Sequence, residues 1–204
     1  MPSSDRIEVA ADRSDAVRRA LALAREAHAG QIRNGSGGMP YIEHPVAVAE
    51  LLAEHDFGEE VLAAALLHDV VEDSEVSVEQ VRESFGEPIA RLVEALTDDE
   101  SIEPYERRKE EHRMRVAEAG ADALAIYAAD KLTNIRALRD AYATQGETVG
   151  EEFKVPLDVK VAVWEADLRQ LAQSVPTLPF LRDLQEQLGG LEADRLNAPG
   201  VTSS

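Results

Sequence analysis

Apolar residues recur at helical spacing along most of this chain. The segment from Ser14 or Asp15 to about Gly30 shows this first, with Val17, Ala20, Leu21 and Ala24 on one face. Pro45 predicts the start of another helix with His44 as its N-cap, because proline is tolerated in a first turn. The other segments with the helical pattern are 59–73, a helix beginning at Ser77, a helix following Gly86 and ending near Thr97, 104–118, 121–142, 157–174 and 178–188.

No segment shows the apolar and polar alternation of a strand, so the pattern predicts an all-α fold. High alanine and glutamate content and only 4% aromatic residues agree with helices. The 204 residues are enough for one domain with a substantial core. We expect a loose leader over residues 1–12, one helical domain of about eight to ten helices over 13–190, and a flexible tail over 191–204.

The apolar run at 63–67 ends in four ionisable residues within six positions: His68, Asp69, Glu72 and Asp73. On a helix turning about 100° per residue, these four side chains fall within one sector. Deep burial of several ionisable groups is costly without a cation or polar partners. Adjacent histidine and aspartate supply one nitrogen and one oxygen donor, so the run predicts one side of a metal site.

Two other residues can complete such a site. Asp130 follows an apolar run like the one before His68, and His44 stands directly after a glycine-rich loop. Together with His68 and Asp69 they form a set of two nitrogen and two oxygen donors, which suits Mn²⁺, Fe²⁺ or Zn²⁺. Glu72 and Asp73, one turn beyond the His-Asp pair, are placed to position a water and handle its proton.

Net charge and composition limit the classes of molecule that this protein is expected to bind. The net charge of −19, from 40 acidic and 21 basic residues, argues against binding nucleic acid polymers or anionic membranes. A phosphorylated small molecule would need local positive charge. The absence of cysteine excludes thiolate chemistry, and the first residues lack the apolar core of a signal peptide, so we expect a cytoplasmic protein.

Several motifs together resemble the hydrolase domain of RelA/SpoT proteins, within the HD-domain metal-dependent phosphohydrolases. These motifs lie at 27–33 (AHAGQIR), 40–45 (PYIEHP), 66–73 (LLHDVVED), 85–86 (FG) and 129–136 (ADKLTNIR). The resemblance covers roughly residues 13–170. It is closest to the stand-alone, metazoan SpoT-homologue type, because the spacing from Arg33 to His44 is longer than in the bifunctional enzymes. We therefore expect a stand-alone small alarmone hydrolase in which water attacks the 3′ phosphorus of (p)ppGpp, leaving GDP or GTP and pyrophosphate, with Mn²⁺ as cofactor.

The resemblance also implies a role for each matching residue. The metal ligands would be His44, His68, Asp69 and Asp130. The catalytic acidic pair would be Glu72 and Asp73. The substrate-binding residues would be Arg33, whose guanidinium packs on the purine, Asn134, and, in a later helix, Lys160 and Trp164 in place of the family's Arg-x-x-x-Tyr.

The sequence departs from the family at two positions, each of which loses a positive charge. Asn34 and Pro104 stand where the family tends to have phosphate-contacting lysines. Lys160 would then carry more of the phosphate contact, and Arg107, Arg108 and Lys109 are nearby cations that could compensate. We interpret His28 as a residue that supports the site from behind, and His55 and His112 as surface residues.

Two alternatives remain open from the sequence. The same chemistry could act on another nucleotide phosphate, such as (p)ppApp or NADPH, because an arginine stacks on any purine. The domain could instead be a non-catalytic nucleotide sensor, although a pure sensor has no need for Glu72. The sequence leaves the oligomeric state, monomer or homodimer, undecided.

Overall fold

The computed structural model describes residues 5–33 and 38–197, and the all-α prediction is confirmed. Across these residues the one β feature is an isolated antiparallel bridge between Ile32 and Pro40. The elements are α1 (Asp5–Arg13), α2 (Asp15–Ala27), α3 (Glu43–Glu54), α4 (Glu59–Leu67), α5 (Val70–Asp73), α6 (Val78–Phe85), α7 (Glu87–Leu96), α8 (Tyr105–Ala119), α9 (Ala121–Gln145), the 3₁₀ helix η1 (Gly146–Glu152), α10 (Leu157–Ser174) and α11 (Leu181–Leu196).

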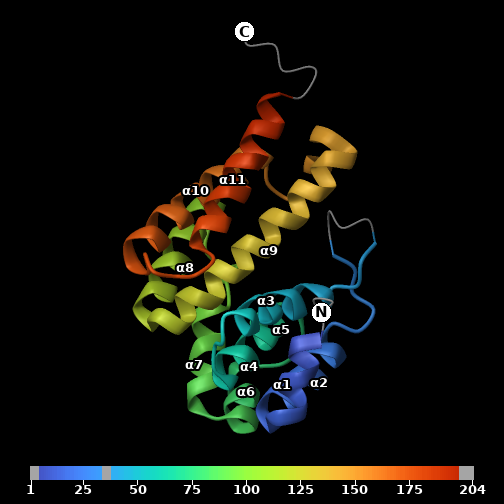
Figure 1. The fold of residues 1–204 in the computed structure, drawn as a ribbon, viewed down its shortest axis with the longest axis vertical. Helices are drawn as coiled ribbons and strands as arrows, with labels where there is room; N and C mark the ends of the chain where they lie inside the picture. Colours follow the sequence, from blue (N-terminus) through green and yellow to red (C-terminus); the bar gives the residue numbers. More distant parts are fainter. Residues whose placement is uncertain (1–4, 34–37, 198–204) are drawn as a thin grey trace.

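Helix α9 runs through the middle of the molecule, with α1 to α7 gathered on one side and α10 and α11 on the other (Figure 1). Helix α4 is the centre of the first group, because all seven residues 61–67 are buried and it packs against α2, α3, α7 and α9. Asp130, on α9, faces the first group, where its carboxylate lies beside His44 and His68. Among the described helices, none is long and apolar enough to cross a bilayer.

The expected leader and tail are wrong for the parts that the structure describes. Residues 5–13 form α1, which buries Ile7, and the Ile7 N–H donates to Glu50 Oε1 at 2.7 Å. The last helix continues to Leu196 and buries Leu191 completely. Both segments are ordered by contacts with distant residues, which a local polar pattern does not reveal.

Two helix boundaries also differ from the prediction. Helix α3 begins at Glu43 with Ile42 as its N-cap, so His44 lies inside the first turn and Pro45 follows it. The helix expected over 59–73 breaks at His68 and Asp69 into α4 and α5. The His68 ring donates from Nδ1 to the Ala65 carbonyl at 2.7 Å, and that carbonyl would accept the Asp69 N–H in an unbroken helix.

Candidate functional site

Four donor side chains converge where α3, α4, α5 and α9 meet. His44 comes from the first turn of α3, His68 ends α4, Asp69 caps α5, and Asp130 comes from α9. His44 Nε2 lies 3.0 Å from Asp130 Oδ1 and 3.6 Å from Asp69 Oδ2, and His68 Nε2 lies 3.1 Å from Asp69 Oδ1. Donor atoms of His44, His68 and Asp130 all lie within 4.8 Å of one another. The arrangement brings together all four predicted ligands.

The tautomer of His68 shows which kind of ligand this cluster suits. Because Nδ1 bonds to a carbonyl oxygen, it must carry the proton, which leaves the lone pair of neutral His68 on Nε2. That atom is buried without a hydrogen-bond partner and faces the carboxylates of Asp69 and Asp130. A lone pair facing buried carboxylates is unfavourable unless a cation or proton lies between them. A divalent cation fits this donor set.

The pKa values of His68 and Asp130 also indicate that the cluster favours a positive charge. Burial disfavours the charged ring of His68, but Asp69 and Asp130 outweigh it and raise the pKa to about 9. Burial opposes ionisation of Asp130 as well, yet Lys131 and His44 hold its pKa well below the ordinary value. The carboxylates therefore stay ionised at neutral pH and available to a metal.

Tyr41 holds Asp69, one of the four donors, through a hydrogen bond. Its hydroxyl donates to Asp69 Oδ2 at 2.8 Å, and its ring stacks on His28 with centroids 4.7 Å apart. His28 is buried and bonds through Nδ1 to Gln31 Oε1 at 2.8 Å. Gln31 in turn donates to the backbone carbonyl of Asp73 at 2.8 Å. This chain of contacts agrees with the supporting role expected for His28, and it fixes the backbone where α5 ends.

The two predicted acidic residues occupy different places. Glu72 lines the cavity in front of the four donors, and its Oε2 accepts the Asp98 N–H at 3.2 Å. Desolvation of the carboxyl, together with the negative charge of Asp69, raises the pKa of Glu72 to about 7, although the residue as a whole remains exposed. Asp73 is not among the lining residues; its carboxyl lies beside the Tyr41 hydroxyl.

All four predicted substrate residues line this cavity, which has a volume of about 160 Å³. Arg33 donates to Asn134 Oδ1 at 2.7 Å, and Asn134 donates to Asp130 Oδ1. The Lys160 ammonium lies 5.1 Å from the centre of the Trp164 ring, which is both buried and lining. Residues of the motifs at 27–33 and 129–136 and residues of α10 therefore line one site.

Two further cations of the cavity were not predicted as site residues. Lys131 Nζ lies 2.7 Å from Asp130 Oδ2 and 4.2 Å from the centre of the Tyr127 ring. Lys109 Nζ lies 2.6 Å from Asp98 Oδ2. Lys109 belongs to the basic triplet considered as compensating charge, while Arg107 pairs with Glu111 on the surface. For Lys131 the available signal was its position directly after Asp130.

Other expectations near the cavity need correction. His112 is buried against Tyr127 rather than on the surface, and it lines the cavity beside Asp98. His55 is exposed, as expected. Pro104 caps α8 without lining the cavity. Asn34 lies outside the described residues.

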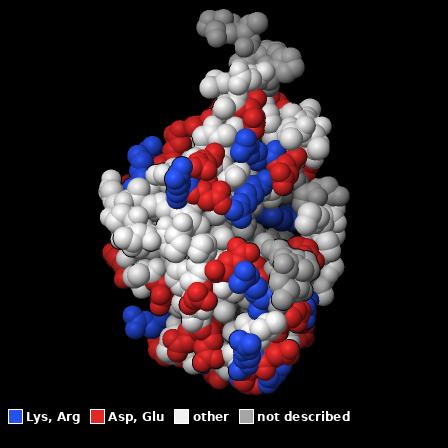
Figure 2. Space-filling view, in the orientation of Figure 1, with Lys and Arg blue, Asp and Glu red and all other residues white. Residues whose placement is uncertain are grey.

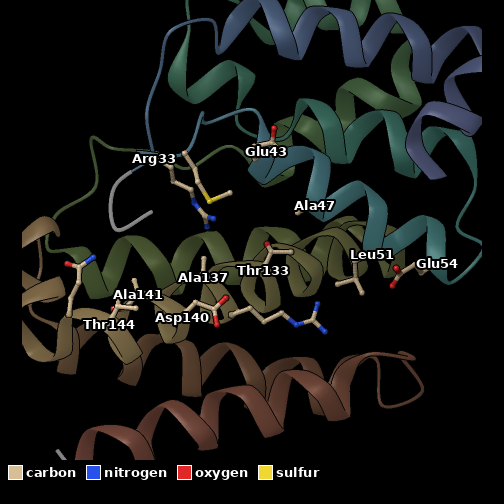
Figure 3. Close-up of a pocket in the computed structure, with 13 residues that line it drawn as sticks. Arg33, Glu43, Ala47, Leu51, Glu54, Thr133, Ala137, Asp140, Ala141 and Thr144 are labelled. Carbon is tan, nitrogen blue, oxygen red and sulfur yellow. The ribbon is translucent and has the colours of Figure 1, made fainter. Parts of the chain in front are cut away.

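A larger cavity of about 490 Å³ adjoins the first between α3 and α9 (Figure 3). Arg33 lines both cavities. The walls of the larger cavity combine apolar surface with carboxylates, from Met39, Ala47, Leu51, Ala137 and Ala141 and from Glu43, Glu54 and Asp140. Arg33 therefore lies at the boundary between the two cavities.

Comparison with known proteins gives consistent matches. Residues 20–155 match the HD domain family. A zebrafish (Danio rerio) protein named guanosine-3′,5′-bis(diphosphate) 3′-pyrophosphohydrolase MESH1 is 39% identical over 122 residues, which are 57% of this chain and 65% of the relative. A Vibrio cholerae protein with the same enzyme name is 40% identical over 129 residues, 61% of this chain but 18% of the relative, so the chain spans only about a fifth of that protein.

The fold comparison agrees. A solved structure described as a metazoan orthologue of SpoT that hydrolyses ppGpp superimposes with a TM-score of 0.68 and 28% identity, covering 89% of this chain and 96% of that one.

Proposed function

This chain belongs to the HD-domain family, and from that premise we propose that it is a metal-dependent phosphohydrolase that removes pyrophosphate from the 3′ position of (p)ppGpp. The observation that carries the proposal is the convergence of His44, His68, Asp69 and Asp130, in which the buried Nε2 of His68 has no hydrogen-bond partner and faces two carboxylates. Relatives named for this reaction support the same substrate class.

These four residues would hold one divalent ion, which we propose to be Mn²⁺. When bound, such an ion acidifies water and offsets the charge that develops on phosphoryl oxygens. The chain's own part is to orient the donors. The Ala65 carbonyl fixes the His68 tautomer, Tyr41 fixes Asp69, and Lys131 occupies the second oxygen of Asp130.

Glu72 is the proposed general base. A carboxylate with a pKa near 7 has about the basicity that proton transfer at neutral pH favours. The Asp98 N–H fixes one of its oxygens and leaves the other for the attacking water. Asp73, the second residue of the acidic pair, would act through Tyr41, whose hydroxyl lies beside Asp73 and donates its one proton to Asp69.

Three ammonium groups would receive the phosphates. Lys109, Lys131 and Lys160 line the cavity that contains the four donors, and fixed cations stabilise phosphoryl oxygens in the ground and transition states. Arg33, at the boundary with the larger cavity, would pack against the purine, and Asn134 holds its guanidinium in place. Trp164 would close the wall next to Lys160.

The test is turnover by purified protein supplied with Mn²⁺, using (p)ppGpp, (p)ppApp and NADPH as a panel and measuring released pyrophosphate and phosphate. We expect (p)ppGpp to give pyrophosphate, and a chelator to abolish its release. Preferential turnover of another nucleotide would replace the substrate but keep the chemistry. Binding without turnover of any nucleotide would show a sensor and refute the proposal.

A further inference from the structure

Asp98 is a buried carboxylate in the wall of the smaller cavity, which would receive phosphate. It follows Thr97, the C-cap of α7, and its side chain is only 3% exposed. Burial opposes ionisation of this carboxyl, yet the neighbouring charge of Lys109 lowers its pKa below the ordinary value. An ionised carboxylate in a phosphate site repels the substrate unless its charge is balanced, so the contacts of Asp98 decide what it does there.

Two cations share one oxygen of this carboxylate. Lys109 Nζ lies 2.6 Å from Asp98 Oδ2, and Arg108 Nε lies 3.3 Å from the same atom. Lys109 lines the smaller cavity, whereas Arg108 is not among its lining residues. Because two cations face one carboxylate, Arg108 can balance Asp98 while the charge of Lys109 stays available to a ligand.

The other oxygen of the carboxylate argues against a purely structural role. Among the described residues Asp98 Oδ1 has no hydrogen-bond partner, since His112 Nδ1, at 3.8 Å, is too distant. A buried acceptor without a partner costs stability, so this ion pair is not arranged for stability alone.

The backbone of Asp98 contacts the proposed base. Its N–H donates to Glu72 Oε2 at 3.2 Å. Arg115 holds the end of α7 just before it, by donating to the carbonyls of Ala95, at 3.3 Å, and Thr97. One residue therefore contacts a cation of the cavity through its side chain and the proposed base through its backbone.

We propose that Asp98 is a positioning residue that holds the Lys109 ammonium in place to contact a phosphate of the substrate, while its backbone holds Glu72. A lysine carries a point charge on a flexible stem, and a charge that is already in place stabilises a phosphoryl group without the cost of ordering that stem. The proposal rests on the proposed function, because it takes the nucleotide phosphates to lie in the smaller cavity. It also predicts that Arg108, which does not line the cavity, affects substrate binding.

The first measurement is steady-state hydrolysis of (p)ppGpp with Mn²⁺. Arg108→Met keeps most of the apolar stem and removes the charge that balances Asp98, so KM should rise about tenfold with a smaller change in kcat. Arg107→Met is the matched control, since this neighbouring side chain is 64% exposed and pairs with Glu111 on the surface. It should leave KM unchanged. An unchanged KM in Arg108→Met would overturn the proposal.

Asp98→Asn tests whether the side chain acts through Lys109, because it removes the charge and keeps the size. If it does, the double variant with Lys109→Met should have a kcat/KM no lower than that of Lys109→Met alone. Asp99→Asn removes the same charge from the exposed neighbouring residue and should leave kcat/KM unchanged. Additive losses in the double variant would show that Asp98 acts by another route and would refute its role.

Labelling of lysines by acetic anhydride, read by mass spectrometry, separates this proposal from the proposed function because it needs no turnover. In the wild type with Mn²⁺, inorganic pyrophosphate should suppress labelling of Lys109 but not of Lys154, which is 93% exposed. In Arg108→Met, about tenfold more pyrophosphate should be needed.

These labelling results without hydrolysis of any nucleotide would keep the role of Asp98 and remove the hydrolase. Hydrolysis of (p)ppGpp in a protein whose Lys109 pyrophosphate does not protect would remove the role of Asp98 and keep the hydrolase. Neither protection nor hydrolysis would remove both.

Discussion

Replacing Lys160 by methionine should stabilise the protein while weakening substrate binding. The ammonium lies in a wall of the smaller cavity, 4.7 Å from the centre of the Phe153 ring and 5.1 Å from that of Trp164. Burial, with the like charges of Lys131 and Lys109, lowers the pKa of Lys160 from 10.5 to about 8. A half-buried cation among other cations costs stability, and a methionine of similar length removes that cost.

The size of the effect follows from the pKa. One unit corresponds to about 1.4 kcal/mol, so keeping Lys160 charged at pH 7 costs roughly 3 kcal/mol. Loss of the two cation–π contacts offsets roughly 1 kcal/mol of this gain. The net stabilisation expected for Lys160→Met is therefore about 1–2 kcal/mol, which for a protein of this length raises Tm by roughly 2–8 °C.

The pH dependence gives the prediction its sign. The pKa of Lys160 is lower in the folded than in the unfolded state, so the cost is fully present below pH 8 and is lost as the pH rises from 8 to 10.5. The advantage of Lys160→Met should thus shrink by roughly 2 kcal/mol between pH 7 and pH 9.5. Urea unfolding of metal-free, nucleotide-free protein at these two pH values measures both differences.

Lys154→Met provides the control, because the Lys154 side chain is 93% exposed and its removal should change stability by less than about 0.5 kcal/mol at either pH. The functional half of the prediction is a KM for the nucleotide raised about ten- to a hundredfold, with a smaller change in kcat. A Lys160→Met protein that is less stable than wild type at pH 7, or a stability difference that does not change with pH, would refute the reasoning.

The remaining predictions concern the metal, the base and the purine. His68→Ala should lose bound metal and activity together, measured by elemental analysis against His55→Ala as an exposed control; a full metal content would refute the ligand assignment. Glu72→Gln should keep the metal and lower kcat on the order of 10²-fold or more, so turnover within a few-fold of wild type would exclude it as the base. Arg33→Ala should raise KM to an extent that persists at high salt, whereas the effect of Lys160 should diminish with screening; equal salt dependence would contradict the stacking role.

The helices that bury a full apolar stripe were predictable from the sequence, and so were the donors that follow buried runs. The capping box at Ser77, where Gln80 completes the second bond, is one boundary that local chemistry specifies. Helix α1 was missed because it buries mainly Ile7 and Ala11 and is fixed by Glu50, 43 residues away. Such a contact leaves no periodic signal.

The cations of the site were harder to predict than its ligands. His68 and Asp69 follow a run that must be buried, so their burial could be inferred from neighbours in the sequence. Lys109 lies within a charged helix, where the sequence resembles an ordinary solvated face. Only the packing of α8 against α7, α9 and α10 turns this lysine into the cavity toward Asp98. Residues whose role depends on tertiary packing have no local pattern in a single sequence that predicts that role.

The charge balance of the smaller cavity suggests why a metal would be needed for binding as well as for chemistry. The protein carries a net charge of −19, and acidic and basic side chains are interspersed over the face shown in Figure 2. The cavity is lined by five carboxylates and four basic side chains, and the raised pKa of His68 adds one positive charge, so without a metal its formal charge is zero. A divalent ion at the four donors would displace the His68 proton and change the formal charge to +1. The nucleotide phosphates would then meet a positive site inside an acidic protein only after the metal has bound, so metal and nucleotide should each raise the affinity of the other.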